Sequence, residues 1–390
     1  MAAITIWWNQ AVTGASERSA SRFYHPELDI LRFFAFLGVF CHHALPHDVS
    51  FYSALGVPRV GGSVLASAGA TGAFGVDLFF ALSDYLITEL LLREKELLGN
   101  LDLKAFYVRR VLRIWPLYFF FLLLAVGMTY FVAGQQLGWR ATLAFTFLSG
   151  NWWIVFRGFP SSVVFPLWSV SIEEQFYLLW PVAARRVKAS GMAAIAVTML
   201  VVATLSRFYL VQHGSTESQI WCNTFARLDP IAVGILAAVL LRGGAPRWTL
   251  TGRAAAFFSG AIMLFTAAVV CQVKADPLTA ARVVVGYPLA ALGAVIVLLA
   301  TLTSRTVLSK SALVYLGKIS YGLYVFHVLG LMLSDYIVPV GYSRFSLYLL
   351  KISVALALTI CFAAASYRWL EHPFLLLKSR FTLIPSRSES

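Results

Sequence analysis

The sequence predicts an all-α polytopic membrane protein, and three observations lead to this fold class. First, 59% of the 390 residues are apolar and only 13% are charged, whereas soluble domains are about 45–50% apolar and about 25% charged. Second, apolar segments of about 17–25 residues, long enough to cross a hydrocarbon core, recur along the chain. Third, the basic residues behind the net charge of +13 gather in short clusters between these segments.

About ten segments qualify as transmembrane helices. They lie at 28–46, 72–92, 114–133, 167–184, 191–212, 226–241, 254–273, 283–303, 312–333 and 346–370. An eleventh stretch near 141–156 is short and mixes Ser149 and Asn151 with tryptophans. Polar and aromatic residues together are typical of a membrane interface, so we predict one re-entrant or interfacial segment there.

The lysines and arginines indicate the orientation, because they accumulate in short cytoplasmic loops. With ten spans and a cytoplasmic N-terminus, about two thirds of the 31 basic residues lie on the cytoplasmic side. This distribution assigns Arg207 to an external segment. If 141–156 also spanned, the basic clusters at 185–188, 242–253 and 305–318 would all face outward. We therefore predict a multi-pass protein of the inner (cytoplasmic) membrane with both termini cytoplasmic.

A single membrane domain at 28–373 is expected, between short cytoplasmic segments at 1–27 and 374–390. The N-terminus lacks the charged start and long apolar run of a cleaved signal peptide. The basic clusters fit loops beside anionic lipid, so the expected partner is the lipid bilayer and not nucleic acid. The four cysteines show no disulfide, redox or zinc spacing, and no metal site is expected.

Ionisable side chains within the apolar segments are candidate functional or paired groups, because burying them in lipid is costly. The first segment carries Asp29 and Arg32 at its cytoplasmic entry. His42 and His43 lie about 16 Å deeper at the rise of an α-helix. An imidazole there can exchange a proton near neutral pH. A structural role at the outer end of the helix is the alternative.

The second and third segments add two further groups. Asp77, Ser83 and Asp84 lie in the second segment, where the two aspartates are two helical turns apart and share one face. Arg110 and Arg113 lie on one face at the cytoplasmic end of the third segment. Two guanidinium groups at that spacing suit a phosphate or pyrophosphate. An ordinary cluster of cytoplasmic positive charge is the alternative.

The fourth segment carries Glu173 and Glu174 among aromatic residues. Ser169, Glu173 and Tyr177 follow helical spacing and form one polar stripe, which indicates a functional role. Later segments each contribute one or two polar groups that are weak signals by themselves: Arg227, Asp229, Tyr321, His327 and Glu371.

Taken together and in this order, the segments resemble the acyltransferase 3 family of integral membrane acyltransferases. The resemblance runs from about Glu27 to Pro373. It rests on an Asp-x-Leu-Arg helix that ends in His-Ala, and on Gly-Val-Asp-Leu-Phe-Phe-x-Leu-Ser, Arg-Arg-x-x-Arg-Ile-x-Pro, Trp-Ser-x-Ser-x-Glu-Glu-Gln-Phe-Tyr, Ile-Ser-Tyr-x-Leu-Tyr-x-x-His and Glu-x-Pro. Six motifs in the same order are far more specific than any one of them.

The resemblance implies roles for individual residues. The family's essential histidine falls on His43, its acidic second-helix position on Asp77 and its glutamate on Glu173. We expect His43 to act as general base on an acceptor hydroxyl, with Asp77 or Glu173 orienting it. A covalent acyl-histidine intermediate remains an alternative.

The paired arginines associated with the acyl donor fall on Arg110 and Arg113, with help expected from Arg32. They would bind the phosphates of coenzyme A at the cytoplasmic side. One position departs from the family, which usually has Gly or Ala where this chain has Asp84. A charged side chain there is expected to narrow or repolarise the donor tunnel.

The resemblance therefore predicts a membrane-bound O-acyltransferase with no bound cofactor. The expected co-substrate is acyl-CoA, in the first instance acetyl-CoA. The acceptor would be a hydroxyl of an exported or membrane-associated carbohydrate, glycolipid or small natural product, and proteins of polysaccharide biosynthesis or export are possible partners. A proton-coupled secondary transporter and a non-catalytic partner of polysaccharide export are the alternatives.

Overall fold

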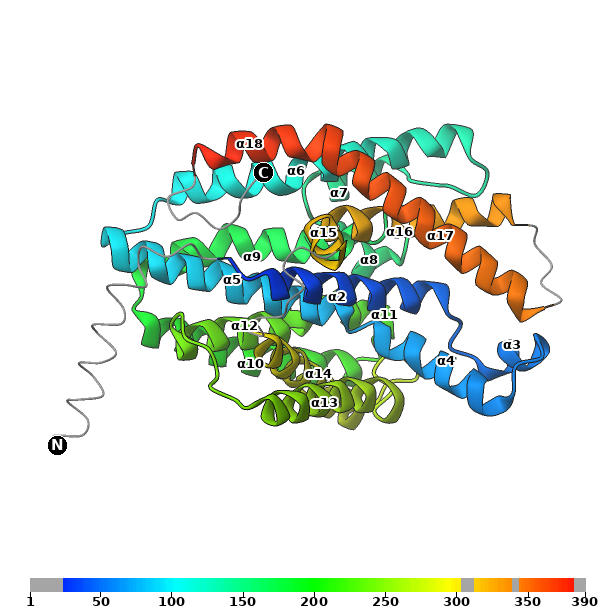
Figure 1. The fold of residues 1–390 in the computed structure, drawn as a ribbon, viewed down its shortest axis with the longest axis horizontal. Coiled ribbons are helices and arrows are strands. Elements are labelled where there is room, and N and C mark those ends of the chain that lie inside the picture. Colours follow the sequence, from blue (N-terminus) through cyan, green and yellow to red (C-terminus); the bar gives the residue numbers. More distant parts are fainter. Residues whose placement is uncertain (1–23, 303–311, 339–343, 382–390) are drawn as a thin grey trace.

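The computed structural model describes residues 24–302, 312–338 and 344–381, and its regular elements in these ranges are all helical. In chain order they are α2 (Pro26–Ala44), α3 (Val49–Ala54), α4 (Arg59–Gly72), α5 (Gly75–Leu98), α6 (Leu103–Phe131), α7 (Trp139–Thr146), α8 (Gly150–Arg157), α9 (Leu167–Arg186), α10 (Ala189–Gln212), α11 (Glu217–Trp221), η1 (Phe225–Arg227), α12 (Leu228–Leu241), α13 (Leu250–Phe265), η2 (Thr266–Val270), α14 (Ala280–Thr301), α15 (Ala312–Lys318), α16 (Ser320–Ile337), α17 (Phe345–Ser366), η3 (Tyr367–Glu371) and α18 (His372–Ser379). Most of the long helices run roughly along the longest axis (Figure 1).

Six helical stretches in the described residues are long and apolar enough to cross a membrane: Arg59–Leu98, Leu103–Phe131, Ala189–Gln212, Leu250–Val270, Ala280–Thr301 and Phe345–Lys378. A seventh is counted if α15 and α16, which meet at a bend of 80°, form one broken span. The all-helical fold class is confirmed for the described residues, and these stretches are its candidate membrane spans. The predicted number of about ten spans is not confirmed.

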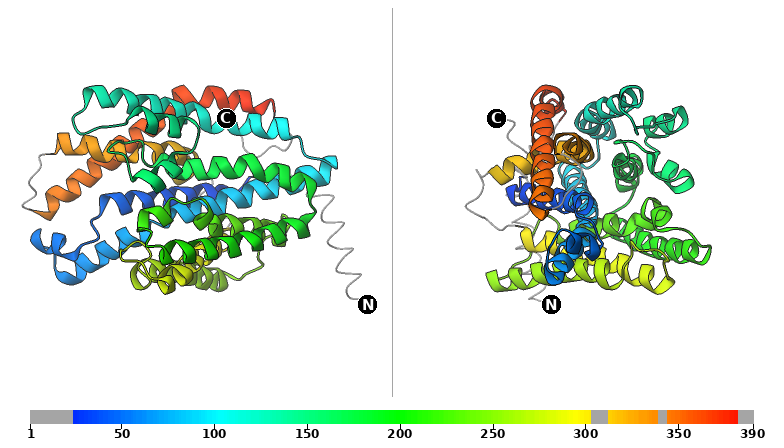
Figure 2. Two further views of the ribbon diagram at one scale, coloured as in Figure 1. Left: turned by 180° about the vertical axis from the view of Figure 1, so that it is seen from behind. Right: turned by 90° about the vertical axis from the view of Figure 1, so that its right-hand side faces the viewer.

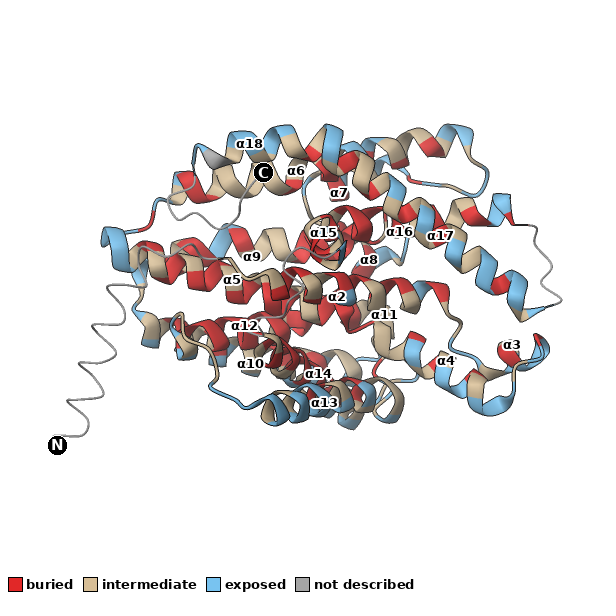
Figure 3. Ribbon diagram, viewed as in Figure 1, coloured by how far each residue is buried: buried red, intermediate tan, exposed pale blue. Residues whose placement is uncertain are grey.

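Three of the predicted spans, α2, α9 and α12, are absent from this count for physical reasons. α2 has 19 residues and carries Glu27, Asp29 and Arg32, and α12 has only 14 residues. α9 carries two adjacent glutamates and a glutamine in its centre. In the end-on view, α2 runs through the middle of the bundle (Figure 2). Buried residues are concentrated in α2, α5 and α12, while α13 and α17 expose much of their surface (Figure 3).

Glycines allow the backbone of α2 to pass close to its neighbours. A Cβ atom on Gly72 would lie 2.2 Å from the carbonyl oxygen of Gly38, and one on Gly75 would lie 2.2 Å from that of Ala35. Real Cβ atoms do not approach a carbonyl oxygen this closely, so larger residues would push the helices apart. These contacts hold α2, which carries the predicted arginine and histidines, against α4 and α5.

The predicted non-spanning segment near 141–156 corresponds to α7 and α8, which have eight residues each. At about 1.5 Å per residue, each is about 12 Å long and much shorter than a hydrocarbon core of about 30 Å. The hydroxyl of Tyr118 on α6 donates to the carbonyl oxygen of Phe145 at 2.7 Å. The segment therefore packs into the bundle as two short helices.

Arg207, which the charge distribution assigns to an external segment, lies within α10, where its side chain is 0% exposed and forms an ion pair with Asp229. The predicted cytoplasmic segments 1–27 and 374–390 lie largely outside the described residues.

Candidate active site

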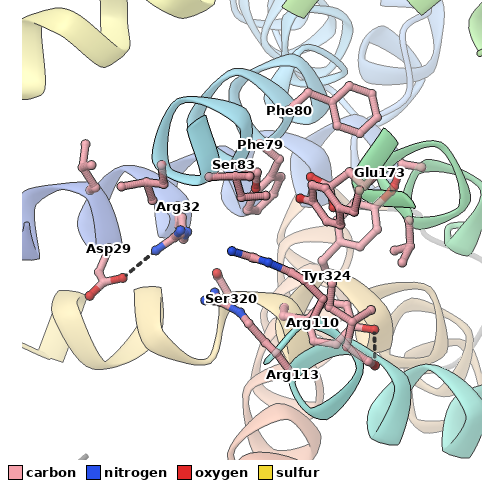
Figure 4. Close-up of a pocket in the computed structure, with 18 of the residues that line it drawn as sticks. Asp29, Arg32, Phe79, Phe80, Ser83, Arg110, Arg113, Glu173, Ser320 and Tyr324 are labelled. Carbon is pink, nitrogen blue, oxygen red and sulfur yellow. Dashed lines mark hydrogen bonds and ion pairs between the residues drawn. The ribbon is translucent and has the colours of Figure 1, made fainter. Parts of the chain in front are cut away.

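A cavity of about 160 Å³ lies among α2, α5, α6, α9, α16 and α18, the last of which contributes Lys378. Its wall combines apolar side chains of α5, including Phe79 and Phe80, with charged and hydroxyl groups from the other helices (Figure 4). Six helices from distant parts of the chain therefore meet around one cavity that combines polar and apolar side chains.

The three arginines predicted to bind the donor all line this cavity. Arg32 comes from α2, and Arg110 and Arg113 come from adjacent turns of α6. Their guanidinium groups point into the same central space (Figure 4). The Nη1 atom of Arg32 donates to Oδ1 of Asp29 at 2.9 Å, which holds Arg32 in place. The cavity thus has a concentrated positive side.

Arg110 is also held by aromatic rings. Its Cζ atom lies 5.4 Å from the ring centroid of Phe106 and 5.4 Å from that of Tyr177, within the range of a cation–π contact. Its buried Nε atom has no hydrogen-bond partner in the described part of the chain. Because a buried donor without a partner is costly, this atom is available to a ligand.

Acidic groups lie in the same region as the arginines. Glu173, Ser83 and Tyr177 line the cavity, whereas Glu174 accepts a hydrogen bond from the indole nitrogen of Trp115 at 2.9 Å. Asp84 is completely buried, is not one of the lining residues, and neither of its carboxylate oxygens has a hydrogen-bond partner among the described residues. Any influence of Asp84 on the cavity therefore passes through its neighbours.

Hydroxyl groups from α9 and α16 form another part of the wall. The hydroxyl of Tyr324 lies 2.7 Å from Oγ of Ser169 and donates to the carbonyl oxygen of Pro166 at 3.0 Å. The hydroxyl of Tyr321 donates to the carbonyl oxygen of Ile114 at 3.1 Å. These bonds fix α16 against α9 and α6.

His43 lies outside the cavity wall but close to it. Its Nδ1 atom is 2.9 Å from the carbonyl oxygen of Val39 and 3.3 Å from Nε2 of His327. His327 is completely buried, and its Nδ1 atom is 2.5 Å from the carbonyl oxygen of Tyr324. His43 keeps an exposed side. The histidine pair is therefore one helical turn from a tyrosine that lines the cavity.

The adjacent His42 has different surroundings. Its Nδ1 atom lies 3.0 Å from the carbonyl oxygen of Gly69, and its ring stacks on that of His47 with 4.7 Å between centroids. Of the two neighbouring histidines, His43 is the one that contacts His327. In the residues that the structure describes, no group of three or more His, Cys, Asp or Glu side chains is arranged to hold a metal ion.

Asp77 takes part in a buried ion pair. Its Oδ2 atom accepts from Nη2 of Arg227 at 2.8 Å, and the guanidinium of Arg227 lies 3.9 Å from a ring centroid of Trp221. A second buried pair joins Arg207 to Asp229 at 2.6 Å. The prediction that Asp77 orients His43 is not what this geometry favours, because Arg227 is the ion-pair partner of Asp77.

The remaining predicted residue, Glu371, accepts a hydrogen bond from Ser366 at 3.2 Å in the last helical stretch. Sequence reasoning did not select Tyr324 or Arg207. Tyr324 lies three residues before His327 in the same motif, so helical spacing was the available signal. Arg207 gave no such signal, since its partner Asp229 follows in another helix.

The profile of an acyltransferase domain family matches residues 25–368. A Staphylococcus aureus (strain MSSA476) protein named "Putative O-acetyltransferase" is 28% identical over 385 residues, covering 90% of this chain and 57% of that protein. A Bacillus subtilis protein named "Putative peptidoglycan O-acetyltransferase YrhL" is 27% identical over 375 residues, covering 90% and 55%. The "Peptidoglycan O-acetyltransferase OatA" of Listeria monocytogenes is 36% identical over 172 residues, covering 41% and 24%.

The chain spans about half the length of the curated relatives that it matches over most of its own length. No solved structure is significantly similar to it.

Proposed function

The chain belongs to the acyltransferase family, and from this premise we propose that it is a membrane O-acetyltransferase that uses acyl-CoA as donor. One observation carries the proposal: Arg32, Arg110 and Arg113 converge in a single cavity whose wall includes Tyr324, one helical turn from His327 and its partner His43. This arrangement supports a site in which phosphate-binding groups and a proton acceptor act together.

The arginines suit the donor because coenzyme A carries several phosphates. Guanidinium groups form short, often bidentate hydrogen bonds to phosphate oxygens. The unpartnered Nε of Arg110 offers such a donor. The apolar wall formed by Val76, Phe79 and Phe80 offers contacts to the pantetheine arm. Glu173 lines the same cavity, so we assign it to contact with the donor.

In the proposed reaction, His43 acts as general base. Its imidazole removes the proton from the acceptor hydroxyl, and the hydroxyl oxygen attacks the carbonyl carbon of the thioester. The carbon–sulfur bond then breaks, and the imidazolium returns its proton to the leaving thiolate. The products are the ester and free coenzyme A. The exposed side of His43 supports approach of the acceptor from outside the donor cavity.

The names of two relatives support a carbohydrate acceptor, since both refer to a peptidoglycan O-acetyltransferase. We therefore propose a cell-surface glycan or its lipid-linked precursor as the acceptor. We also propose that the protein lies in the inner membrane, with the arginine side of the cavity facing cytoplasmic acyl-CoA. Proteins of polysaccharide biosynthesis or export would be its partners.

The experiment measures transfer of radiolabelled acetyl from acetyl-CoA to glycan in inverted membrane vesicles, with peptidoglycan precursor as acceptor. We expect Arg110→Ala and Arg113→Ala each to raise the KM for acetyl-CoA about 10-fold or more. A change of this size corresponds to the loss of one or two charge-assisted hydrogen bonds to the donor. Arg109→Ala is the matched control, because Arg109 lies in the same helix but bonds Glu94 and is not a lining residue. Equal KM values for all three variants would contradict the proposal.

A further inference from the structure

We propose that His327 is a positioning residue that holds His43 as the tautomer with a proton on Nδ1 and a free lone pair on Nε2. The inference rests on the proposed function, in which His43 is the general base. It adds a residue to the machinery and specifies which atom of His43 receives the proton.

Two backbone carbonyl oxygens contact the histidine pair. The carbonyl oxygen of Val39 lies 2.9 Å from Nδ1 of His43, and that of Tyr324 lies 2.5 Å from Nδ1 of His327. A carbonyl oxygen only accepts hydrogen bonds, and a neutral imidazole carries its proton on one nitrogen. Both contacts therefore require the proton on Nδ1.

These two assignments determine the bond between the rings. If Nδ1 of His327 carries its proton, Nε2 of His327 has a lone pair and is an acceptor. Nδ1 of His43 lies 3.3 Å from that Nε2 atom. The proton on Nδ1 of His43 is thus shared between the carbonyl oxygen of Val39 and the second ring. The direction of donation is from His43 to His327.

The reverse arrangement is unfavourable at both ends. With the proton on Nε2 of His327 pointing at a bare Nδ1 of His43, two nitrogen lone pairs would face the carbonyl oxygens of Val39 and Tyr324. Both contacts would be repulsive at 2.9 Å and 2.5 Å. Buried acceptors facing acceptors lose their hydrogen bonds and carry the full cost of desolvation. The two backbone contacts therefore select the same direction.

The burial of the two rings fits this assignment. His327 is completely buried, and its ring centroid lies 4.9 Å from that of His43. The ring of His43 also contacts Phe165, with 5.7 Å between centroids. With Nδ1 bonded on the buried side and an exposed side remaining, Nε2 is the atom left for a substrate hydroxyl. When Nε2 takes a proton, the two acceptors on Nδ1 stabilise the imidazolium.

Two amide variants separate the acceptor role from the local packing role. In His327→Gln the side-chain oxygen reaches the position of Nε2 and can still accept from His43. In His327→Asn the shorter amide can donate to the carbonyl oxygen of Tyr324 but does not reach His43. Both variants place one neutral amide at the same buried position, so they differ mainly in reach.

The first readout is independent of activity. Protein labelled with ¹⁵N-histidine is reconstituted in lipid bilayers, and the signals of His43 among the seven histidines are assigned by comparison with His43→Gln. We expect a protonated Nδ1 and a bare Nε2 in wild type and in His327→Gln. In His327→Asn the carbonyl oxygen of Val39 is the one acceptor left on Nδ1, so we expect a larger share of the tautomer protonated on Nε2. A protonated Nε2 on His43 in the wild-type protein would overturn the inference.

The second readout is steady-state acetyl transfer. We expect His327→Asn to lower kcat about 10-fold with the KM for acetyl-CoA unchanged. We expect His327→Gln to keep most of the wild-type kcat. Equal kcat values for the two variants would contradict a positioning role. If the tautomer result holds but wild type transfers no acetyl group, the proposed function fails and the assignment of the hydrogen bond between the rings stands.

Discussion

The buried pair of Asp77 and Arg227 allows a quantitative test of the structure. The two side chains are 1% and 0% exposed and are joined at 2.8 Å. Asp77→Leu would leave a guanidinium without its counter-charge in the interior. Breaking a buried ion pair by removing one partner costs about 3–5 kcal/mol. We expect Asp77→Leu and Arg227→Met each to lower the free energy of unfolding by about that amount.

The double variant provides the decisive comparison. Replacing a whole buried ion pair with apolar residues of similar volume is often neutral or stabilising. Asp77→Leu combined with Arg227→Met should therefore recover most of the lost stability. Asp335→Ala is the control, because its ion pair with Lys351 leaves the Asp335 side chain 46% exposed. Exposed pairs contribute only about 0–1 kcal/mol.

Stability is measured by unfolding in mixed micelles with increasing SDS, followed by the fluorescence of the 11 tryptophans. The claim that Asp77 and Arg227 form a buried ion pair would be refuted by either of two results. One is a loss of less than about 1 kcal/mol in the free energy of unfolding of each single variant, and the other is a loss in the double variant equal to the sum of the single losses. Acetyl transfer is measured on the same samples. If the double variant is stable and transfers acetyl at the wild-type rate, the role of Asp77 is structural. If it is stable but inactive, Asp77 has a catalytic role.

Two further predictions concern packing and the donor cavity. Gly317→Ala should lower the free energy of unfolding by about 1–3 kcal/mol, because its Cβ would lie 1.9 Å from the carbonyl oxygen of Asp29, while Gly127→Ala, which has open space around it, serves as control in the same SDS titration. Asp84→Gly should change the relative kcat/KM for acetyl-CoA and longer acyl-CoAs, because it removes a buried carboxyl group beside the residues that line the cavity. Unchanged ratios would exclude an effect of Asp84 on donor selection.

Much of the fold could be predicted from hydropathy, because every predicted apolar segment contains a helix. The number of spans is harder to predict. α2 and α12 contain apolar residues at high density, but one carries three charges and the other has 14 residues. Hydropathy measures burial away from water and does not distinguish a helix in lipid from one inside a bundle.

Part of the cavity wall could be predicted from the sequence, but the contacts between distant helices could not. The spacing of Arg110 and Arg113 on one helix face is local, so it could be read from the sequence. The partners of Asp77 and His43 could not, because Arg227 and His327 lie 150 and 284 residues away in the chain. Pairing between distant helices depends on how the bundle packs, and local patterns in a single sequence do not reveal that packing.

The most direct test of the central claim compares His43→Ala with His42→Ala in inverted vesicles supplied with radiolabelled acetyl-CoA. The two histidines are adjacent on α2, but in the described residues it is His43 whose ring nitrogen contacts His327. We expect His42→Ala still to transfer label to glycan and His43→Ala to transfer label about 100-fold more slowly or worse, the range for loss of a general base. Transfer that survives in His43→Ala, or that is lost equally in both variants, would contradict this expectation.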